Sequence, residues 1–545
     1  MDIRLPELSA HQIETLRKYG VEEQYTTSTC LVNFGDRDYD FYVILAGGIC
    51  IKNADDPTDS MVEHGVNQFT GSSNILSNRA SELSAETKAN TTVLRIKPEK
   101  LKKAISDHSD ISDLLLKTFL LRQQGLLEEV EGGIKVLGKE NAGSTYNLRD
   151  FMEKNSLWYN FIDVDKHEQA QALLESFDLC EEDLPVLIDG KNNVAKNPTI
   201  EELAKYTGVI VDWDDKVFDV LVVGAGPGGL AASVYAASEG LSVITIDSKA
   251  PGGQAGKSSK IENYLGFPIG ISGKDLATNG FVQAQKFGCQ ISIPHLVEKI
   301  EHTKNHYIIT ATNCQPIKAK TIVAATGAAY SKLPVEHLEK YEGAGVYYSA
   351  TAMHATMCKN AEVGVVGGGN SAGQAALFLA KYAKKVYVII RGKDLSAKMS
   401  DYLVRRIYAQ ENIDVLTASN VTALGGNTYM EWVEIYQGEN RVDNKILYLF
   451  TFIGAKPCTE WIGDSIQTDS KGFISTGYTI ENSAIDGSLG FATRKPYPFE
   501  TSSPGFFAVG DVRSGSVKRV ASAVGEGSIV ISDIHKYLAL ESVYS

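Results

Sequence analysis

The chain has 545 residues, a length that suggests three or four domains. Its net charge of -14 argues against a general nucleic-acid-binding protein, because the phosphate backbone would repel it. The sequence has no apolar signal segment at its start and no run of about 18 apolar residues, so we expect neither a secretory signal nor a membrane span. The 7 cysteines are scattered, which predicts no metal site, no disulfide framework and a cytoplasmic location.

Residues 1–124 contain a β-rich pattern followed by helices. Residues 41–51 indicate two strands around a Gly47-Gly48 turn, and Thr92–Ile96 indicates another short strand. From Pro98 to Arg122 the apolar residues have helical spacing. The pattern resembles the cyclic-nucleotide-binding domain, and this resemblance implies a β-roll with helices.

In that family a cassette with backbone N–H groups, an acid and an arginine holds the ligand. Its counterpart here is Phe69–Thr87, in which Gly71 matches but Ser72 takes the position of the acid. Arg79 is the candidate for the arginine, at a shorter spacing than the family has. We therefore interpret this domain as cyclic-nucleotide-binding in shape rather than in ligand, and as a docking or interaction module.

Residues 125–212 alternate strands and helices as a compact α/β module. We expect a capping box at Thr199-x-x-Glu202, helices at 144–155 and 168–177, and strands at Ile134–Leu137, Tyr159–Val164 and Val186–Ile188. This order resembles a glutaredoxin-like thioredoxin fold, in which Leu184-Pro185 takes the place of the family's cis-proline. The resemblance puts the redox motif at residues 141–145 (NAGST), where there is no cysteine. Because thiol–disulfide exchange needs a thiolate, we expect a redox-silent adaptor.

The stretch from Asp219 to Asp247 is the one around which the chain is organised. An apolar strand is followed by GxGxxG, a helix, a second strand and an acid, which is the order of a dinucleotide-binding βαβ unit. In such a unit the glycines allow a tight turn and the approach of a pyrophosphate to the helix N-terminus, and the acid accepts hydrogen bonds from a ribose. The candidate residues are Gly224, Gly226, Pro227, Gly229 and Asp247.

Three further motifs follow this unit in order. They are PGGQAGKSSKIENYLGFP from Pro251, ATG at residues 325–327 and GFFAVGDVR from Gly505. From about Val217 to the C-terminus the chain resembles a low-molecular-weight thioredoxin reductase, and the resemblance implies that this fold binds FAD. It assigns to FAD the residues Gly253, Gln254, Asn263, Thr326, Gly327, Gly510, Asp511, Arg519, Val520 and Ala521.

A second dinucleotide unit is inserted between the two parts of the first. Its GxGxxA turn supplies the candidate residues for binding NAD(P)H, which are Gly367, Gly369, Asn370, Ser371 and Ala372. The strand that follows ends in Arg391, where an acid would bind a ribose 2′-hydroxyl and an arginine can pair with a 2′-phosphate. Lys393 and Lys398 add positive charge nearby, so NADPH is favoured. Gly392 stands where the family often has a second arginine, which leaves NADH open.

The family's dithiol, CATC, is absent from the segment before this unit. Ser349 and Ala352 occupy the two cysteine positions, so disulfide reduction by the family mechanism is not expected. His354 could protonate a reduced flavin or an acceptor, because a histidine titrates near neutral pH; a structural histidine is the alternative. Cys358 stands alone, as either a redox sensor or a buried inert thiol.

We therefore expect a multidomain fold. A β-roll with helices (1–124) and a thioredoxin-like α/β module (125–212) precede two Rossmann-like three-layer dinucleotide-binding domains. The FAD domain has two parts, 213–330 and 455–545, on either side of an NAD(P)H domain at 331–454. The resemblance implies a homodimer, and a nicotinamide domain that rotates about hinges at Ala329–Lys332 and Phe452–Pro457.

The expected activity is hydride transfer from NADPH to FAD and on to an acceptor that the sequence does not identify. Oxygen, a quinone, a ferredoxin or flavodoxin, or a disulfide of a partner protein are the alternatives. A competing hypothesis is a redox-silent sensor that binds FAD and NADPH and acts on a partner through the N-terminal modules.

Overall fold

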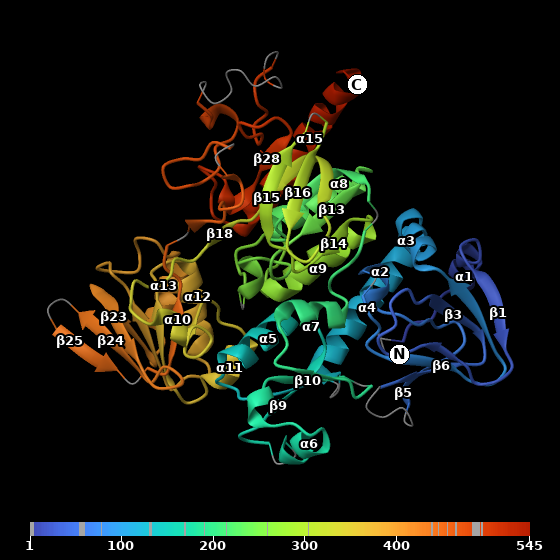
Figure 1. The fold of residues 1–545 in the computed structure, drawn as a ribbon, viewed down its shortest axis with the longest axis horizontal. Coiled ribbons are helices and arrows are strands. Elements are labelled where there is room, and N and C mark those ends of the chain that lie inside the picture. Colours follow the sequence, from blue (N-terminus) through green and yellow to red (C-terminus); the bar gives the residue numbers. More distant parts are fainter. Residues whose placement is uncertain are drawn as a thin grey trace.

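The computed structural model describes residues 5–53, 60–77, 79–129, 133–167, 170–189, 191–213, 215–258, 260–303, 305–437, 440–444, 446–454, 456–463, 466–481, 491 and 494–544. The chain runs from a β-rich module through a small α/β module into two larger α/β folds (Figure 1). The last segment returns to the first of these two folds, where the C-terminal helix α15 (Val520–Tyr544) packs on α8 (Pro227–Ser238). Among the described residues, every helix is too short or too polar to cross a lipid bilayer.

The first module is built from two antiparallel sheets. One has the order β1 (Val21–Tyr25), β7 (Thr91–Ile96), β3 (Phe41–Ala46), and the other β2 (Cys30–Val32), β6 (Ser84–Thr87), β4 (Ile49–Lys52), β5 (Ser60–His64). The two strands expected within residues 41–51 are present, but they belong to different sheets. Gly47 between them has φ +79°, and an added Cβ would lie 2.5 Å from the Thr91 hydroxyl. A glycine is therefore required at this change of sheet.

The helices of this module are α1 (Ala10–Leu16), α2 (Asn74–Ser77), α3 (Pro98–Asp107) and α4 (Ser109–Glu129). The helical stretch expected from Pro98 to Arg122 is thus two helices. His108 separates them, because its backbone is extended with φ -130° and ψ 105°. The buried side chains of α3 and α4 still join one core with Phe41 and Phe69.

The second module has a four-stranded sheet in the order β11 (Val194–Lys196), β10 (Val186–Ile188), β8 (Ile134–Gly138), β9 (Tyr159–Asp163). Only the β8–β9 pair is parallel. The helices are α5 (Gly143–Lys154), α6 (Ala170–Ser176) and α7 (Ile200–Thr207), and the expected capping box of Thr199 and Glu202 begins α7. The Leu184-Pro185 bond is cis. Residue 168, the expected start of α6, lies outside the described residues.

The first large fold is a mainly parallel sheet with helices on its faces. The strand order is β14 (Gln290–Ser292), β13 (Val243–Ile246), β12 (Val217–Val223), β17 (Ile317–Ala324), β16 (Tyr307–Ala311), β15 (Val297–His302). Near the C-terminus, β28 (Phe506–Ala508) adds to β17 in parallel. Helices α8, α9 (Gly273–Lys286) and α15 complete the fold. Its core continues into the second module, because Leu148, Phe151 and Met152 of α5 cluster with Val220 and Val222 of β12.

The second large fold has a parallel sheet in the order β19 (Val346–Tyr347), β26 (Tyr448–Thr451), β20 (Glu362–Val366), β21 (Lys385–Ile389), β22 (Ile413–Leu416). Its helices include α11 (Ala352–Met357), α12 (Asn370–Leu379) and α13 (Asp401–Tyr408). A three-stranded antiparallel sheet, β23 (Ser419–Gly425), β24 (Trp432–Gln437) and β25 (Asn440–Asn444), stands beside it. Helix α12 begins directly after the glycine turn, since Gly369 is its N-cap.

A short ribbon joins the two large folds. Strands β18 (Ala328–Ala329) and β27 (Lys456–Pro457) pair antiparallel, and the Ser331 N–H donates to the Ile453 carbonyl at 2.9 Å. The two expected hinge segments therefore lie side by side. Because only two short strands connect the folds here, other contacts must fix their relative orientation.

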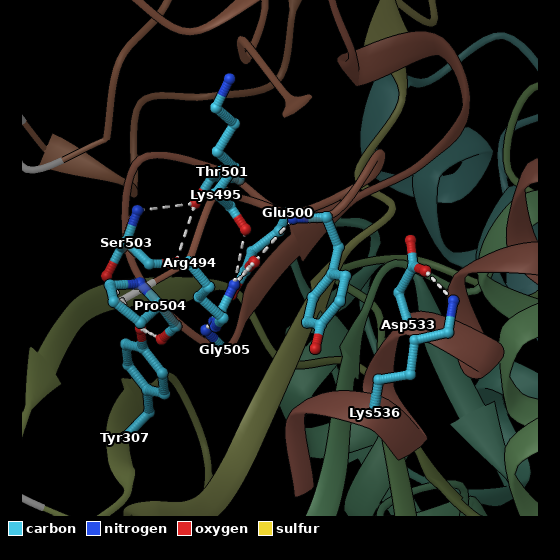
Figure 2. A network of polar contacts seen from close by, with 11 residues as sticks. Tyr307, Arg494, Lys495, Glu500, Thr501, Ser503, Pro504, Gly505, Asp533 and Lys536 are labelled. Carbon is cyan, nitrogen blue, oxygen red and sulfur yellow. Dashed lines mark hydrogen bonds and ion pairs between the residues drawn. The ribbon is translucent and has the colours of Figure 1, made fainter. Parts of the chain in front are cut away.

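A buried ion pair fastens the loop before β28 (Figure 2). The Arg494 guanidinium donates to both Glu500 carboxylate oxygens, at 2.6 and 2.7 Å, and the Glu500 side chain is 0% exposed. The same carboxylate accepts the N–H groups of Tyr497 and Gly505, each at 2.9 Å. The Tyr307 hydroxyl of β16 donates to the Pro504 carbonyl at 2.6 Å. These bonds fix the entry of β28 and so the position of the segment after it.

Candidate functional site

The first glycine turn is held tightly between β12 and α8. Gly224 has φ +107°, and a Cβ there would lie 2.4 Å from the Ala325 carbonyl oxygen. A Cβ at Gly229 would lie 1.8 Å from the Gly224 carbonyl oxygen. Gly226 is the N-cap of α8 with no side-chain cap, and Pro227 is the first residue of the helix. The backbone therefore comes close to the sheet and leaves the first N–H groups of α8 for a ligand.

Asp247 follows β13 and supports the turn from the side. Its carboxylate accepts the Ala225 N–H at 2.8 Å and the N–H groups of Lys249 and Ala250 at 2.8 and 3.2 Å. Burial raises the pKa of this carboxyl, against the hydrogen bonds that lower it. Asp247 thus has a structural part in closing the turn, beside the ribose contact that the sequence predicts.

The segment from Pro251 lies against the glycine turn. Gly253 has φ +53°, and its added Cβ would be 3.1 Å from the Gly226 Cα. The Gln254 side-chain amide donates to the Ala328 carbonyl at the start of the ribbon. Asn263 is exposed and lines neither cavity described below, so its place beside the flavin stays a prediction. Its neighbour Glu262 instead pairs with Arg406 of α13 at 2.7 Å.

Two further segments complete this side of the site. The Thr326 hydroxyl donates to the Cys458 carbonyl at 2.7 Å, and Gly327 has φ +67°. After β28, Gly510 has φ +73° and its N–H donates to Glu526 of α15 at 2.7 Å. Asp511 follows, and burial raises its pKa. Helix α15 begins at Val520, with Arg519 just before it and Ala521 in its first turn.

A cavity of about 1370 Å³ lies beside the Asp247, Pro251 and Thr326 segments, but the Gly224 turn, Asp511 and the start of α15 do not line it. Asp247, Gly253, Gln254, Thr326 and Cys458 line one side of it. The opposite wall comes from the other three modules and includes Arg79, Lys154, Tyr146, Ser349 and Ala352. The two N-terminal modules therefore contribute to the wall of a cavity that Asp247 and the Pro251 segment of the first large fold also line.

The second glycine turn repeats the first in the other fold. Gly367 has φ +142°, and its added Cβ would lie 2.7 Å from the Phe452 carbonyl oxygen. Gly369 caps α12 without a side-chain bond, and Ala372 is buried beneath the turn. The Asn370 side chain accepts the Ser400 N–H at 2.7 Å, so it braces a neighbouring loop. Ser371, in the first turn of α12, shares a small cavity with Gln254 and Tyr330 of the other fold.

Arg391 is the second residue after the end of β21 at Ile389 and is exposed, as are Lys393 and Lys398. Arg391 and Lys393 closely follow the carboxyl end of the strand after α12, and Lys398 lies further along the same connecting segment. In a Rossmann-like unit this is where the ribose of the nucleotide lies. The arrangement is compatible with a 2′-phosphate on that ribose.

The vacant dithiol segment is buried against the second module. Ser349 is 3% exposed and His354 is 0% exposed. The Thr351 N–H donates to His354 Nδ1 at 3.1 Å, so the neutral ring carries its proton on Nε2, which lies 3.2 Å from the Tyr146 hydroxyl. Burial lowers the pKa of His354 to about 3. A neutral, fully bonded imidazole is a poor proton donor, so this geometry favours a structural histidine over the acid considered from the sequence.

Cys358 is also buried, and burial raises the pKa of its thiol. A thiolate is the reactive form of cysteine, so the environment favours an inert thiol. Among the described residues, no group of three His, Cys, Asp or Glu side chains could hold a metal ion.

Two residues of the site were missed in the sequence. Tyr146 of α5 reaches the vacant dithiol segment across 208 positions of sequence, and no local pattern signals such a contact. Lys257 lines both cavities, and burial beside Lys154 and Lys249 lowers the pKa of its amine to about 8. For the second residue, the sequence did offer a signal, which was a lysine in the segment that begins with PGGQ.

Two Rossmann-like folds, each with a glycine turn before an uncapped helix and joined by a ribbon, define a class of proteins that bind two dinucleotides. The chain belongs to the pyridine nucleotide-disulphide oxidoreductase family, whose sequence model matches residues 218–527. It is a flavoprotein oxidoreductase of the thioredoxin reductase-like kind, and the family implies binding of FAD and NAD(P)H.

Relatives match the same part of the chain. It is 31% identical over 317 residues to the thioredoxin reductase of Mycoplasmopsis pulmonis, which covers 58% of this chain and 95% of that protein. It is 31% identical to a 34.2 kDa protein in the rubredoxin operon of Clostridium pasteurianum, over 60% of this chain and 98% of that one. The solved structure of T. acidophilum thioredoxin reductase matches with a TM-score of 0.52 and 28% identity, over 60% of this chain and 100% of that one.

Proposed function

We propose that the protein is an NAD(P)H-dependent FAD oxidoreductase that passes electrons to an acceptor without a dithiol of its own. The observation that carries the proposal is the meeting of the two nucleotide folds. Ser371, at the start of α12, lines the same small cavity as Gln254 of the segment beside the first glycine turn. The helix that would hold the pyrophosphate of one nucleotide therefore begins next to the segment that would hold the other.

The residues present fit both cofactors. Each turn has glycines where a Cβ would strike backbone, and each following helix has no side-chain cap. FAD would be held by Gly224, Gly226, Asp247, Gln254 and Asp511, and the first turn of α15. NADPH would be held by the Gly367 turn and Arg391. When bound, the flavin supplies hydride acceptance from the nicotinamide and hydride donation onward.

The protein's own residues position these groups. The N–H groups at the start of α8 and α12 favour pyrophosphates, because a helix N-terminus carries partial positive charge. The raised pKa of Asp511 marks a carboxyl held in a partly dry place, where it could accept a hydroxyl of a ribityl chain. Lys257 adds a cation that could bind a negative charge beside the flavin.

Ser349 and Ala352 cannot take part in thiol exchange, because attack on a disulfide requires a thiolate. We therefore propose that oxygen, a quinone, a ferredoxin or flavodoxin, or a partner's disulfide accepts the electrons. The homodimer implied by the resemblance is part of this proposal, and sedimentation of the purified protein would test it.

The N-terminal modules are proposed to be adaptors. Arg79 is 6% exposed, donates to the Asn155 carbonyl at 2.9 Å and stacks over Phe281 of α9 at 5.0 Å. The cassette arginine is thus engaged in docking. The strand order of the second module supports a thioredoxin-like fold, and its α5 begins without a cysteine at residues 141–145.

One experiment tests the enzyme. Purified protein with bound FAD is mixed with NADPH without oxygen, and the flavin absorbance is followed. Bleaching within seconds to minutes is expected. A flavin band unchanged over an hour with both NADPH and NADH would favour the second candidate, a redox-silent sensor, which the docking of both modules around the cavity also supports.

A further inference from the structure

Tyr146 of the second module is built into the wall of the nicotinamide fold. Its ring centroid lies 5.1 Å from that of Tyr347 and 5.7 Å from that of His354. Its hydroxyl is 3.2 Å from His354 Nε2. The ring packs against the same hydrophobic core as Val363 and Val365 of β20. A side chain from one module therefore completes the interior of another.

The backbone around Tyr146 is equally close. A Cβ added at Gly143 would lie 3.6 Å from the Glu342 carbonyl oxygen. A Cβ added at Gly343 would lie 2.9 Å from the Tyr146 Cδ1. The N-terminal turn of α5 and the chain before β19 thus lie in contact: a Cβ at Gly143 would make an ordinary contact, whereas one at Gly343 would crowd the Tyr146 ring.

The rest of α5 is fixed to the FAD side. Leu148, Phe151 and Met152 belong to the core that the second module shares with β12 and α8. At its C-terminus, the Asn155 side-chain amide donates to the Lys249 carbonyl at 3.0 Å, beside the glycine turn. Helix α5 therefore bridges the two nucleotide folds alongside the β18–β27 ribbon, and it is anchored at both ends.

In the mechanism of the family that this chain resembles, the nicotinamide domain rotates so that the dithiol and the nicotinamide contact the flavin alternately. A chain with Ser349 and Ala352 in place of the dithiol has no use for this alternation. We propose that Tyr146 is a positioning residue that locks the nicotinamide domain in the orientation in which hydride passes to the flavin. The proposal rests on the proposed function, and it assigns to the second module the task of holding one orientation.

The locked orientation is compatible with hydride transfer. Ser371 and Gln374 of α12 line one small cavity with Gln254 and Lys257 of the flavin segment. Arg406 of α13 pairs with Glu262 at 2.7 Å across the same interface. The nucleotide-binding end of α12 therefore already faces the flavin side, and rotation away from it would separate Tyr146 from Tyr347 and His354.

The first test measures flavin reduction by rapid mixing with saturating NADPH. Tyr146→Ala is expected to slow the reduction rate constant about tenfold, since two aromatic contacts and a hydrogen bond are lost. NADPH affinity and FAD content should stay unchanged, because the proposal gives Tyr146 the role of fixing the domain orientation and not of binding a nucleotide. Tyr146→Phe keeps the ring and should stay within about threefold of the parent. Tyr206→Ala, in α7 of the same module, is the matched control and should reduce at the parent rate.

The second test cross-links the contact. Gly143→Cys combined with Glu342→Cys should form a disulfide on oxidation, shown by the loss of two titratable thiols. The oxidised protein should reduce its flavin with NADPH within about twofold of its dithiothreitol-treated form, because locking is its normal state. Glu342→Cys alone controls for the lost ion pair with Lys332.

The outcomes separate the two levels of the argument. A parent protein that does not bleach with NADPH or NADH refutes the proposed function. A parent that bleaches, with Tyr146→Ala equal to it, overturns the lock. Loss of flavin reduction in the cross-linked form, with recovery after dithiothreitol, would show that rotation is required. Failure of the disulfide to form would show that the contact is not populated in solution.

Discussion

Replacing Arg494 by methionine tests how the FAD-side fold holds its last segment. Methionine keeps most of the apolar stem but leaves the Glu500 carboxylate, which is 0% exposed, without its cation. Breaking a buried pair by removing one partner costs about 3–5 kcal/mol. The two backbone N–H groups that remain, from Tyr497 and Gly505, satisfy the carboxylate only in part.

That cost is large beside the total stability of a domain, which is about 5–15 kcal/mol. With a shift of about 2–4 °C per kcal/mol for a domain of this size, the unfolding midpoint should fall by about 6–20 °C. The loop before β28 would loosen, so Gly510 and Asp511 would lose their fixed position and the affinity for FAD should fall as well.

The assay is thermal unfolding followed by the release of flavin fluorescence, with free FAD in the buffer kept constant. Arg405→Met is the control, because Arg405 pairs with Asp401 at 2.9 Å with both side chains at least 75% exposed. A surface pair within one helix contributes about 0.5 kcal/mol or less. Equal midpoints for Arg494→Met and Arg405→Met would refute the assignment of a stabilising role to the buried pair.

Four further predictions follow. Gly224→Ala should lower bound FAD at least about tenfold, because its Cβ would meet the Ala325 carbonyl oxygen at 2.4 Å; absorbance at a fixed protein concentration measures it. Arg391→Ala should abolish any preference for NADPH over NADH in flavin reduction, and equal rates in the parent would contradict the role of this residue. The free energy of unfolding should fall by at most about 1.4 kcal/mol per pH unit as pH drops from about 6.5 toward 3, because the unfolded chain protonates His354 and the folded state does not. In urea titrations at a series of pH values, His354→Gln should remove this part of the pH dependence. Cyclic AMP and cyclic GMP should leave the melting temperature unchanged, because Arg79 is already bonded within the chain, and a clear upward shift would overturn the docking interpretation.

The glycine turns could be predicted because their cause is local. GxGxxG between an apolar strand and a helix of small residues has few structural solutions, and the turns at Gly224 and Gly367 have positive φ as the motif requires. The capping box at Thr199 was predictable for the same reason. In each case residues within a few positions determine the geometry.

The parts that escaped prediction depend on distant residues. The break at His108 separates α3 and α4, although the helical spacing runs across it. Glu262 pairs with Arg406, 144 positions away. The burial of His354 depends on Tyr146 in another module. Sequence spacing gives the residue types near a site, but such long-range partners decide which way each side chain turns.

The two ends of α5 contact different modules of the protein. With 12 residues, the helix is about 18 Å long. Just past one end, the Asn155 carbonyl accepts Arg79 of the cassette region, and near the other end Tyr146 enters the nicotinamide fold. Between these two contacts, Leu148, Phe151 and Met152 hold the helix in the core that it shares with β12. One short helix thus joins the cassette region, the FAD-side core and the nicotinamide fold.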